Sequence, residues 1–242
     1  LVSDNGIDCV VVKFCVPMND RIKIVENCIT VPAQLLLDDF VIQVIENNLG
    51  DLTFLSGIPG TVGGAIAGNA GAFGQQIGDL LIDTEVIDRN GNIQKIIQKN
   101  LNFTYRSSYF KNNSDIILNA SFKLNNFDKN KMIKKRDEIL NLRFNKHPNW
   151  KKEPCAGSIF RNIEPSSAAE KRQAAGWFLE QAGVKDFKEG KAFVYNKHAN
   201  IIIANTGSTA SDVYKLSERM KKAVLKKFNI ELIREIQLLG SF

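Results

Sequence analysis

The alternation of hydrophobic and polar positions in the first fifty residues predicts short strands followed by one helix. Residues 8–14 form a β-branched run, and residues 22–25 and 29–31 are shorter runs of the same kind. Residues 35–47 repeat their hydrophobic positions every three or four residues, which is the period of a helix with one buried face. The chain is therefore expected to begin as β structure with short loops and then to enter a helix.

The middle of the chain continues this pattern and ends in a longer helix. Residues 81–88 and 93–97 predict two strands, and the Asn-Gly pair between them is a strong hairpin signal. Another strand is expected over residues 115–124. Residues 129–143 have the helical period, with apolar Met, Ile, Ile and Leu side chains. Prolines and a tryptophan interrupt the pattern at residues 148–154, so we place a domain boundary there.

After this boundary, short helices and short strands are mixed. Residues 176–183 predict a helix closed by glycine, and residues 192–195 and 200–204 predict short strands. A Thr-x-x-Asp capping box at residues 209–212 begins a final helix with apolar residues at helical spacing. Residues 231–239 alternate enough to be a strand. The architecture expected for the whole chain is α+β.

Composition excludes several classes of protein. The 242 residues are 44% hydrophobic and 24% charged, close to the averages for globular domains, which excludes a disordered chain or a fibre. The length allows one large domain or two modest ones. The longest apolar runs, residues 10–14 and 201–204, are far shorter than the roughly 20 residues of a membrane helix. We therefore expect no transmembrane protein.

The formal net charge of +6 comes partly from two basic runs, residues 129–152 and 221–227. Basic runs can bind nucleic acid. Both runs, however, lie in segments of helical period, where they would form the solvated face, and we favour that interpretation. A basic surface equally suits an anionic small substrate such as a nucleotide sugar. We expect no nucleic-acid partner.

The cysteines and the N-terminal residues indicate a reducing compartment. The four cysteines form no C-x-x-C pair and have no histidines at zinc spacing, so we expect free thiols and no metal. Residues 1–12 include acidic side chains and lack the basic start and apolar core of a signal peptide. We expect a cytoplasmic protein. Because the chain has no initiator methionine, we also expect that residues upstream of Leu1 are missing.

The most informative feature is a glycine cluster at residues 57–74, which holds 7 of the 17 glycines of the chain. Without Cβ atoms, a backbone can approach a ligand closely and direct consecutive N–H groups at phosphate oxygens. The cluster would suit a pyrophosphate or a flavin ring. It lacks the Gly-Lys-Ser/Thr of a P-loop and the spacing of a Rossmann fingerprint. A tightly packed set of turns is the alternative.

Residues 55–74 resemble the signature of the UDP-N-acetylenolpyruvoylglucosamine reductase (UDP-N-acetylmuramate dehydrogenase) family. Four more stretches match in order, namely residues 105–110 (YRSSYF), 156–162 (AGSIFRN), 197–200 (KHAN) and 231–240. Residues 1–6 fit the segment that follows the family's G-G-G-S-N flavin-phosphate loop. The resemblance covers essentially the whole chain.

This resemblance implies an NADPH-dependent flavoenzyme that converts UDP-N-acetylglucosamine enolpyruvate to UDP-N-acetylmuramate for bacterial peptidoglycan. It implies an FAD-binding domain of the flavoprotein oxidase (PCMH-like) type over residues 1–147, lacking its N-terminal part. A smaller α+β substrate-binding domain would follow over residues 148–230, and residues 231–242 would return to the active site. FAD is the expected cofactor, NADPH is the expected co-substrate, and the protein is expected to be a monomer.

The family's functional residues can be carried over to this chain. Arg106 would hold the substrate carboxylate with paired hydrogen bonds. Ser158 would donate a proton to C2, and Glu235 would form a hydrogen bond with the developing carboxylate. Lys146 and Asn162 would bind substrate, with Lys146 assisting Ser158. The expected cofactor contacts are Gly57, Ile58, Pro59, Gly60, Thr61, Gly63, Gly64, Asn69, Gly71 and Gly74.

Each catalytic assignment has a plainer alternative. Arg106 would then be a loop arginine in an ion pair, Ser158 a turn or cap hydroxyl, and Glu235 an exposed strand carboxylate. In the catalytic interpretation, these three side chains are expected to meet in one site. The two histidines of the chain are assigned no catalytic role.

Two features depart from the family pattern. The G-G-G-S-N loop and the residues before it are absent, so half of the cradle for the flavin pyrophosphate is lacking. Gln237 stands where the family usually has a basic residue. In addition, only 51 residues separate Arg106 from Ser158, which favours the family branch without a tyrosine-bearing insertion. Two other functions stay open: another oxidoreductase of the same flavin-binding superfamily, and a non-catalytic fragment that binds nucleotide sugar.

Overall fold

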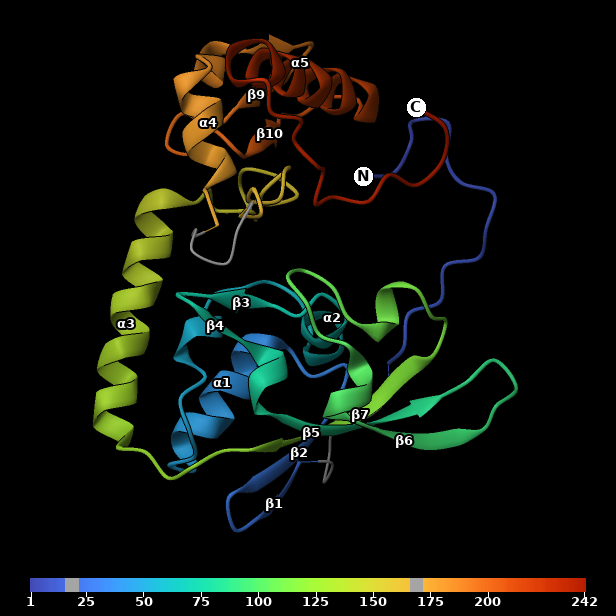
Figure 1. The fold of residues 1–242 in the computed structure, drawn as a ribbon, viewed down its shortest axis with the longest axis vertical. Coiled ribbons are helices and arrows are strands. Elements are labelled where there is room, and N and C mark those ends of the chain that lie inside the picture. Colours follow the sequence, from blue (N-terminus) through green and yellow to red (C-terminus); the bar gives the residue numbers. More distant parts are fainter. Residues whose placement is uncertain (16–21, 166–171) are drawn as a thin grey trace. The chain divides into compact units, whose positions relative to one another are not determined.

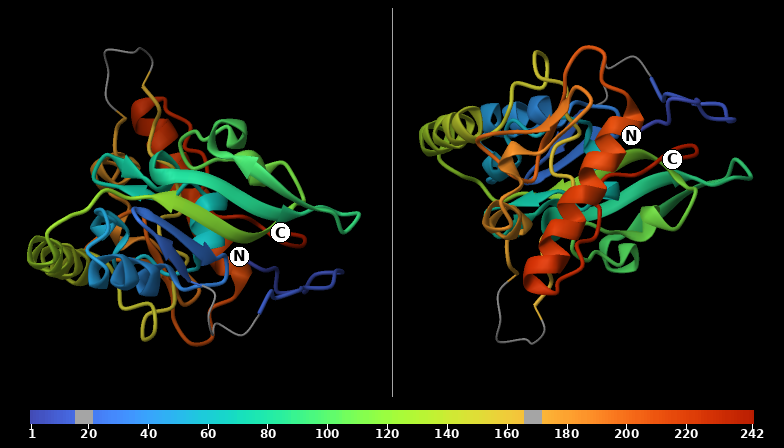
Figure 2. Two further views of the ribbon diagram at one scale, coloured as in Figure 1. Left: turned by 90° about the horizontal axis from the view of Figure 1, so that it is seen from below. Right: turned by 90° about the horizontal axis from the view of Figure 1, so that it is seen from above.

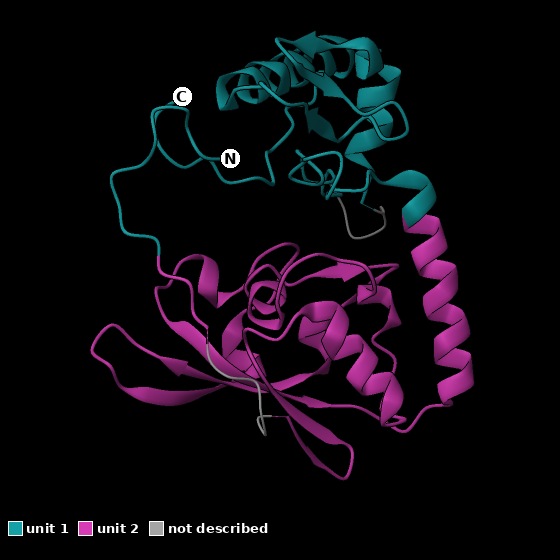
Figure 3. Ribbon diagram, turned by 180° about the vertical axis from the view of Figure 1, so that it is seen from behind, with its two compact units in different colours: residues 1–11, 144–242 teal, residues 12–143 magenta. Residues whose placement is uncertain are grey.

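The computed structural model describes residues 1–15, 22–165 and 172–242. These residues form two compact units (Figure 3). Unit 1 comprises residues 1–11 and 144–242, and unit 2 comprises residues 12–143. Both units combine antiparallel sheets with helices, which confirms the α+β class. No helix of the described residues is long and apolar enough to cross a membrane.

Unit 2 is built on a five-stranded antiparallel sheet in the order β1-β2-β7-β5-β6 (Figure 1). The strands are β1 (Lys23–Val25), β2 (Cys28–Pro32), β5 (Leu81–Ile87), β6 (Ile93–Ile97) and β7 (Ile116–Lys123). All five were predicted from the sequence pattern. The long connection from β2 to β5 carries the glycine cluster, and β7 returns to pair with both β2 and β5.

The sheet is apolar on one face and polar on the other. Phe122 of β7 points into the core, where it packs against Phe40 of helix α1 (Leu37–Glu46) with ring centroids 4.8 Å apart. Val62 and Ile66 of helix α2 (Val62–Ala67) are fully buried in the same core. In an antiparallel sheet with one covered face, apolar and polar residues alternate along each strand. This alternation is visible in the sequence of each strand alone, which is why the strands could be predicted.

Short elements complete unit 2. They are the two-stranded pair β3 (Gly71–Ala72) and β4 (Gln75–Gln76), and the 3-10 turns η1 (Thr53–Leu55), η2 (Ile77–Leu80), η3 (Gln98–Leu101) and η4 (Tyr109–Lys111).

Helix α3 (Lys129–Lys146) begins in unit 2, and the division between the units falls within it. Met132 and Ile139 are buried as predicted, whereas Ile133 and Leu142 are 42% and 47% exposed. The lysines of the helix are exposed, so they form a solvated face. Lys135 forms an ion pair with Asp51 at 2.5 Å, which joins the helix to the rest of unit 2.

Unit 1 contains a three-stranded antiparallel sheet in the order β10-β9-β8 and two packed helices, of which the longer is the orange-red helix in Figure 2. The elements are α4 (Ala175–Gln181), η5 (Val184–Asp186), β8 (Lys188–Glu189), β9 (Ala192–Val194), β10 (Ile202–Ala204) and α5 (Ala210–Phe228). The buried stripe of α5, including Leu216 and Met220, packs in one core with Phe178 and Leu179 of α4.

The predicted capping box starts α5. Thr209 Oγ1 accepts a hydrogen bond from the Asp212 amide at 3.0 Å, and Asp212 Oδ2 accepts one from the Thr209 amide at 3.0 Å. The carboxylate of Asp4 accepts from the next two amides, Ala210 N at 2.6 Å and Ser211 N at 2.9 Å. The first residues of the chain are thereby anchored within unit 1.

We expect Thr209→Ala to lower the free energy of unfolding by about 1 kcal/mol, because one of the first helical amides loses its acceptor. Urea titration followed by circular dichroism would measure the change. Thr206→Ala, at an exposed position of the preceding loop, is the matched control and should leave stability unchanged. Equal destabilisation by both variants would contradict the capping role.

Two predicted strands are wrong. Residues 8–14 form no strand, and their Val10, Val11 and Val12 are 87%, 76% and 83% exposed. Residues 231–239 form only isolated bridges, of Arg234 with Phe160 and of Leu239 with Val2. A β-branched or alternating run becomes a strand only where a continuous partner supplies hydrogen bonds and packing, and the described residues provide none here.

The two units also group residues differently from the expected domains. Residues 1–11 lie in unit 1, where Ser3 N donates to Leu239 O at 2.8 Å. The division after Arg143 lies four residues before the expected boundary at 147/148. The tail was expected as a separate segment over residues 231–242, and it belongs to unit 1 throughout.

Candidate functional site

The glycine cluster folds into turns around the short helix α2. Gly57, Gly60 and Gly74 have φ angles of 71°, 126° and 80°, a region that residues with side chains rarely adopt. Between them, Ile58 packs against the core of unit 2 and Pro59 is exposed. Part of the glycine content therefore serves the turns themselves.

Two other glycines of the cluster are required by close packing. A Cβ atom on Gly63 would lie 2.9 Å from the Cβ of Ala33, and one on Gly71 would lie 2.4 Å from the carbonyl oxygen of Gln75. Real Cβ atoms do not approach neighbours so closely, so these positions exclude any larger residue. The packed-turn interpretation accounts for them.

Gly64 is different, because an added Cβ would make only an ordinary contact. The nearest atom would be Thr61 Oγ1 at 3.6 Å, and the residue is exposed on the first turn of α2. Thr61 caps this turn by accepting a hydrogen bond from Gly64 N at 3.2 Å. At Gly60 and Gly74 nothing lies within 4 Å of an added Cβ. The backbone at these three glycines can therefore be approached closely by a ligand.

Asn69 ties the cluster to the segment that carries Arg106. The side chain is 2% exposed, and its Nδ2 donates to Gln76 Oε1 and to Thr104 O, both at 2.9 Å. Its Oδ1 accepts from Gly78 N at 3.2 Å. These three hydrogen bonds give the amide a structural role, so a contact with a cofactor would have to come from the backbone.

Arg106 lies in a tight turn closed by backbone hydrogen bonds between Thr104 and Ser107. Its φ of 55° is left-handed, which costs free energy in a residue with a side chain and is concentrated at functional sites. The guanidinium Nη1 donates to Gly71 O at 3.3 Å, and its central carbon lies 5.6 Å from the centroid of the Tyr105 ring. The turn thus holds the cation at the edge of the glycine cluster.

Arg143 is a candidate that the sequence analysis missed. Its Nη2 donates to Phe54 O at 3.3 Å, and its Nε is buried with no hydrogen-bond partner among the described residues. Burial, and secondly the positive charge of Arg106, lower the pKa of its guanidinium. A signal was present, because Arg143 follows Met132 and Ile139 on the buried stripe of α3. Two guanidinium groups whose charges repel each other form a favourable site for an anion.

Ser158 and Glu235 lie on neighbouring backbone segments of unit 1. Ser158 is half-buried and forms an antiparallel bridge with Ile201. The Glu235 amide donates to Ile159 O at 2.8 Å. The structure therefore brings together two of the three predicted catalytic positions, while Arg106 lies in unit 2.

Of the predicted substrate-binding residues, Asn162 contacts the start of a helix and Lys146 ends one. Asn162 Oδ1 accepts a hydrogen bond at 3.2 Å from the amide of Ala175, the first residue of α4. Lys146 is the exposed last residue of α3. Its charge lies close enough to His198 to oppose protonation of that imidazole.

The two histidines of the chain are in contact, with the ring centroids of His147 and His198 5.4 Å apart. Burial is the main cause that lowers the pKa of His198 from its ordinary value of 6.5, and Lys146 and Lys185 lower it further, while Glu180 raises it. The folded protein therefore holds this imidazole neutral where the unfolded chain would begin to bind a proton.

We expect the unfolding free energy to decrease as the pH falls from the unfolded-state pKa through the lower folded-state pKa of His198, because the unfolded chain binds the additional proton. His198→Gln should weaken this dependence. Lys197→Gln, at an exposed neighbouring position, is the control and should retain it. Urea titrations from about pH 7.5 to about pH 5 would measure the effect, and a slope identical in His198→Gln would contradict the assignment.

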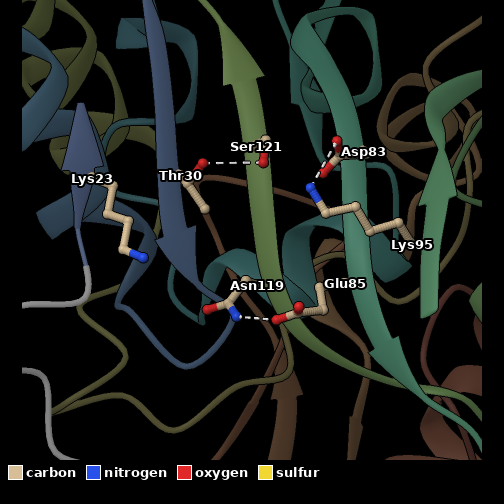
Figure 4. Close-up of a pocket in the computed structure, with 7 residues that line it drawn as sticks. All are labelled: Lys23, Thr30, Asp83, Glu85, Lys95, Asn119 and Ser121. Carbon is tan, nitrogen blue, oxygen red and sulfur yellow. Dashed lines mark hydrogen bonds and ion pairs between the residues drawn. The ribbon is translucent and has the colours of Figure 1, made fainter. Parts of the chain in front are cut away.

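A separate polar hollow of about 480 Å³ lies on the open face of the unit 2 sheet (Figure 4). Several of its side chains interact with one another: the hydroxyls of Thr30 and Ser121 lie 3.1 Å apart, and Asn119 donates to Glu85 at 2.6 Å. No predicted site residue lines it. This is the solvated face expected of a half-buried sheet.

Two family models match the chain. Residues 1–96 match the model described as FAD binding domain, and residues 148–239 match that of the UDP-N-acetylenolpyruvoylglucosamine reductase C-terminal domain. The solved structure of UDP-N-acetylenolpyruvylglucosamine reductase from Thermus caldophilus superposes with a TM-score of 0.73 and 27% identity, covering 87% of this chain and 72% of that chain. The fold and these matches define the class of the protein as an FAD-binding oxidoreductase.

Individual relatives identify the family within this class. The UDP-N-acetylenolpyruvoylglucosamine reductase of Bacillus pumilus is 33% identical over 241 residues, covering 99% of this chain and 76% of the relative. That of Carboxydothermus hydrogenoformans is 35% identical over 244 residues, with the same coverage. The chain belongs to the UDP-N-acetylenolpyruvoylglucosamine reductase family, as the resemblance implied, and is shorter than these relatives.

Proposed function

We propose that the protein catalyses the NADPH-dependent reduction of UDP-N-acetylglucosamine enolpyruvate to UDP-N-acetylmuramate, a step of peptidoglycan synthesis. The observation that carries the proposal is the 33% identity to a reductase of this name over 99% of the chain. The backbone of Glu235 binds that of Ile159, the residue after Ser158, and this proximity supports the proposal, because Ser158 and Glu235 are assigned to the same reacting group.

The residues of unit 2 fit FAD. An added Cβ would meet nothing within 4 Å at Gly60 and Gly74 and would make only an ordinary contact at Gly64, so a ligand can approach the backbone at these glycines. We assign the glycine cluster to FAD binding, with Gly64 as the position of closest approach. When bound, FAD supplies the hydride that it receives from NADPH.

Arg106 holds the carboxylate of the substrate in this proposal. A guanidinium is always charged and can form two parallel hydrogen bonds with a carboxylate, so it also stabilises the negative charge that develops beside C2. Arg143 adds a second cation close to Arg106. Its pKa, lowered by burial and by Arg106, would rise again when an anion neutralises the pair.

Ser158 donates the proton that C2 requires, and Glu235 forms a hydrogen bond with the carboxyl group. Lys146 assists Ser158 by stabilising the alkoxide left after proton transfer, and Asn162 binds the sugar or phosphate. The chain is assigned to the branch without a tyrosine-bearing insertion, acts as a monomer and works in the cytoplasm. The four free cysteines accord with a reducing compartment.

The experiment that tests the proposal has two stages. The purified chain is titrated with FAD and followed by flavin absorbance and fluorescence, and the complex is then mixed anaerobically with NADPH and with the enolpyruvyl substrate in turn. Bleaching by NADPH and recovery of colour by the substrate are expected. Binding of the UDP-sugar without any flavin would instead identify a non-catalytic binder, and recovery with a different oxidant only would identify another flavin oxidoreductase.

A further inference from the structure

Asn200 is a buried amide whose two polar atoms both bind one distant residue. Asn200 is 2% exposed. Its Oδ1 accepts a hydrogen bond from Phe160 N at 3.0 Å, and its Nδ2 donates to Phe160 O at 2.8 Å, across 40 residues of sequence. An amide side chain carries one acceptor and a donor group, as a peptide unit does. It therefore binds Phe160 as a neighbouring strand would.

The backbone of Asn200 extends this contact toward Ser158. Asn200 O accepts from Ile159 N at 2.9 Å, and the next residue, Ile201, forms the bridge with Ser158. On the opposite side, Ile159 O accepts from Glu235 N at 2.8 Å. Residues 158–160 are thus held between Asn200 and its neighbour on one side and the segment of Glu235 on the other.

The side chain of Asn200 is needed to bind Phe160, because the backbone before Asn200 turns away from Phe160. His198 N donates to Tyr195 O at 3.1 Å, and His198 O accepts from Ile201 N at 3.0 Å, so these groups are used inside their own turn. Phe160 is 1% exposed. Without the amide of Asn200, its buried peptide groups would lose both partners, which is costly in a site that water cannot enter.

We infer that Asn200 is a positioning residue, whose amide fixes the backbone of residues 158–160 and thereby the place of the Ser158 hydroxyl. This inference rests on the proposed role of Ser158 as proton donor. A serine has one side-chain torsion before its oxygen, so the backbone largely determines where the hydroxyl lies. Proton transfer is sensitive to displacements of this kind, and a shift of about 1 Å can cost about 10²-fold in rate.

Asn200→Asp tests the inference with an isosteric change. The carboxylate still accepts from Phe160 N but repels Phe160 O, whereas the protonated carboxyl group restores both hydrogen bonds. His198 Nδ1 accepts a hydrogen bond from Asn200 N at 3.3 Å, so each measurement is compared with the unaltered chain at the same pH. Relative to that reference, we expect hydrogen–deuterium exchange of residues 158–161 to accelerate at about pH 8 and protection to return at about pH 5, since burial raises the pKa of a carboxyl group. Asn196→Asp places the same charge at an exposed position and should change the exchange of residues 158–161 at neither pH.

The kinetic arm separates positioning from general stability. Flavin reduction by NADPH should be unchanged in Asn200→Asp, whereas reoxidation by the enolpyruvyl substrate should slow about tenfold or more at about pH 8. In a Ser158→Ala background, Asn200→Asp should cause no further slowing, because the group that it positions is already gone. Asn200→Ser, whose shorter side chain lacks the amide that binds Phe160, is the second variant and should show the same separation.

The outcomes distinguish the two proposals. If Ser158→Ala alone leaves reoxidation unchanged, the role of Ser158 fails and the positioning role fails with it. If Ser158→Ala slows reoxidation but Asn200→Asp does not, only the positioning role is overturned. Equal slowing by Asn200→Asp with and without the Ser158 hydroxyl, or loss of near-ultraviolet circular dichroism in both Asn200 variants, also overturns it.

Discussion

Replacement of Ser158 by alanine is expected to slow reoxidation of the reduced flavin by the enolpyruvyl substrate by about 10²-fold or more, the usual size of a general-acid effect. Reduction of the flavin by NADPH should be unaffected, because that half-reaction does not involve C2 of the substrate. Substrate affinity should fall little, since one neutral hydroxyl contributes about 0.5–1.5 kcal/mol. Stopped-flow measurement of each half-reaction separately provides the test.

Ser158→Cys is the matched variant for this experiment. A thiol at the same position can still donate a proton, so part of the lost rate should return. Equal slowing of the two half-reactions, or a loss confined to substrate affinity, would show that Ser158 binds rather than protonates the substrate. The general acid would then have to be another group.

Replacement of Gly64 by valine is expected to weaken FAD binding by at least about 10²-fold, equivalent to about 2.8 kcal/mol. An added Cβ on Gly64 would make only an ordinary contact, with Thr61 Oγ1 at 3.6 Å, so we expect the valine variant to fold and its side chain to occupy the path of the cofactor. Fluorescence titration with FAD measures the affinity, and thermal unfolding verifies that the variant is folded.

Two further variants control this result. Gly64→Ala adds only one methyl group, with ordinary contact to Thr61, and should have an intermediate effect. Gly63→Val, which the motif alone would suggest as an equivalent test, should instead disturb the fold, because its side chain would meet Ala33. An unchanged FAD affinity in folded Gly64→Val would leave the cluster with a packing role only.

Local patterns were sufficient for much of the fold. The strands of the unit 2 sheet and helices α1, α3 and α5 follow from periodicity, because each buries one face against a core. The capping box at Thr209 was equally predictable, since its hydrogen bonds join residues three positions apart. The failures, residues 8–14 and 231–239, have suitable residues for strands but no continuous partner in the described structure.

The candidate site could be predicted only in part. The motifs indicated Arg106, Ser158 and Glu235, and the structure adds that Glu235 pairs with the residue after Ser158. Arg143 escaped notice because a basic run on a helix usually faces solvent, and only its spacing from Ile139 distinguished it from the exposed lysines. The structural role of Asn69 was likewise hidden, because its partners lie up to 35 residues away.

The sequence by itself determined the local elements, the concentration of glycine at residues 57–74 and the family to which the chain belongs, because these depend on residue type and short-range order. Only the tertiary structure decided which glycines are packed and which are open, that Arg143 stands near Arg106, and that Asn200 binds the segment of Ser158. The physical reason is the same in each case. Steric space, burial and hydrogen-bond partners are set by residues distant in the chain, and no local pattern records them.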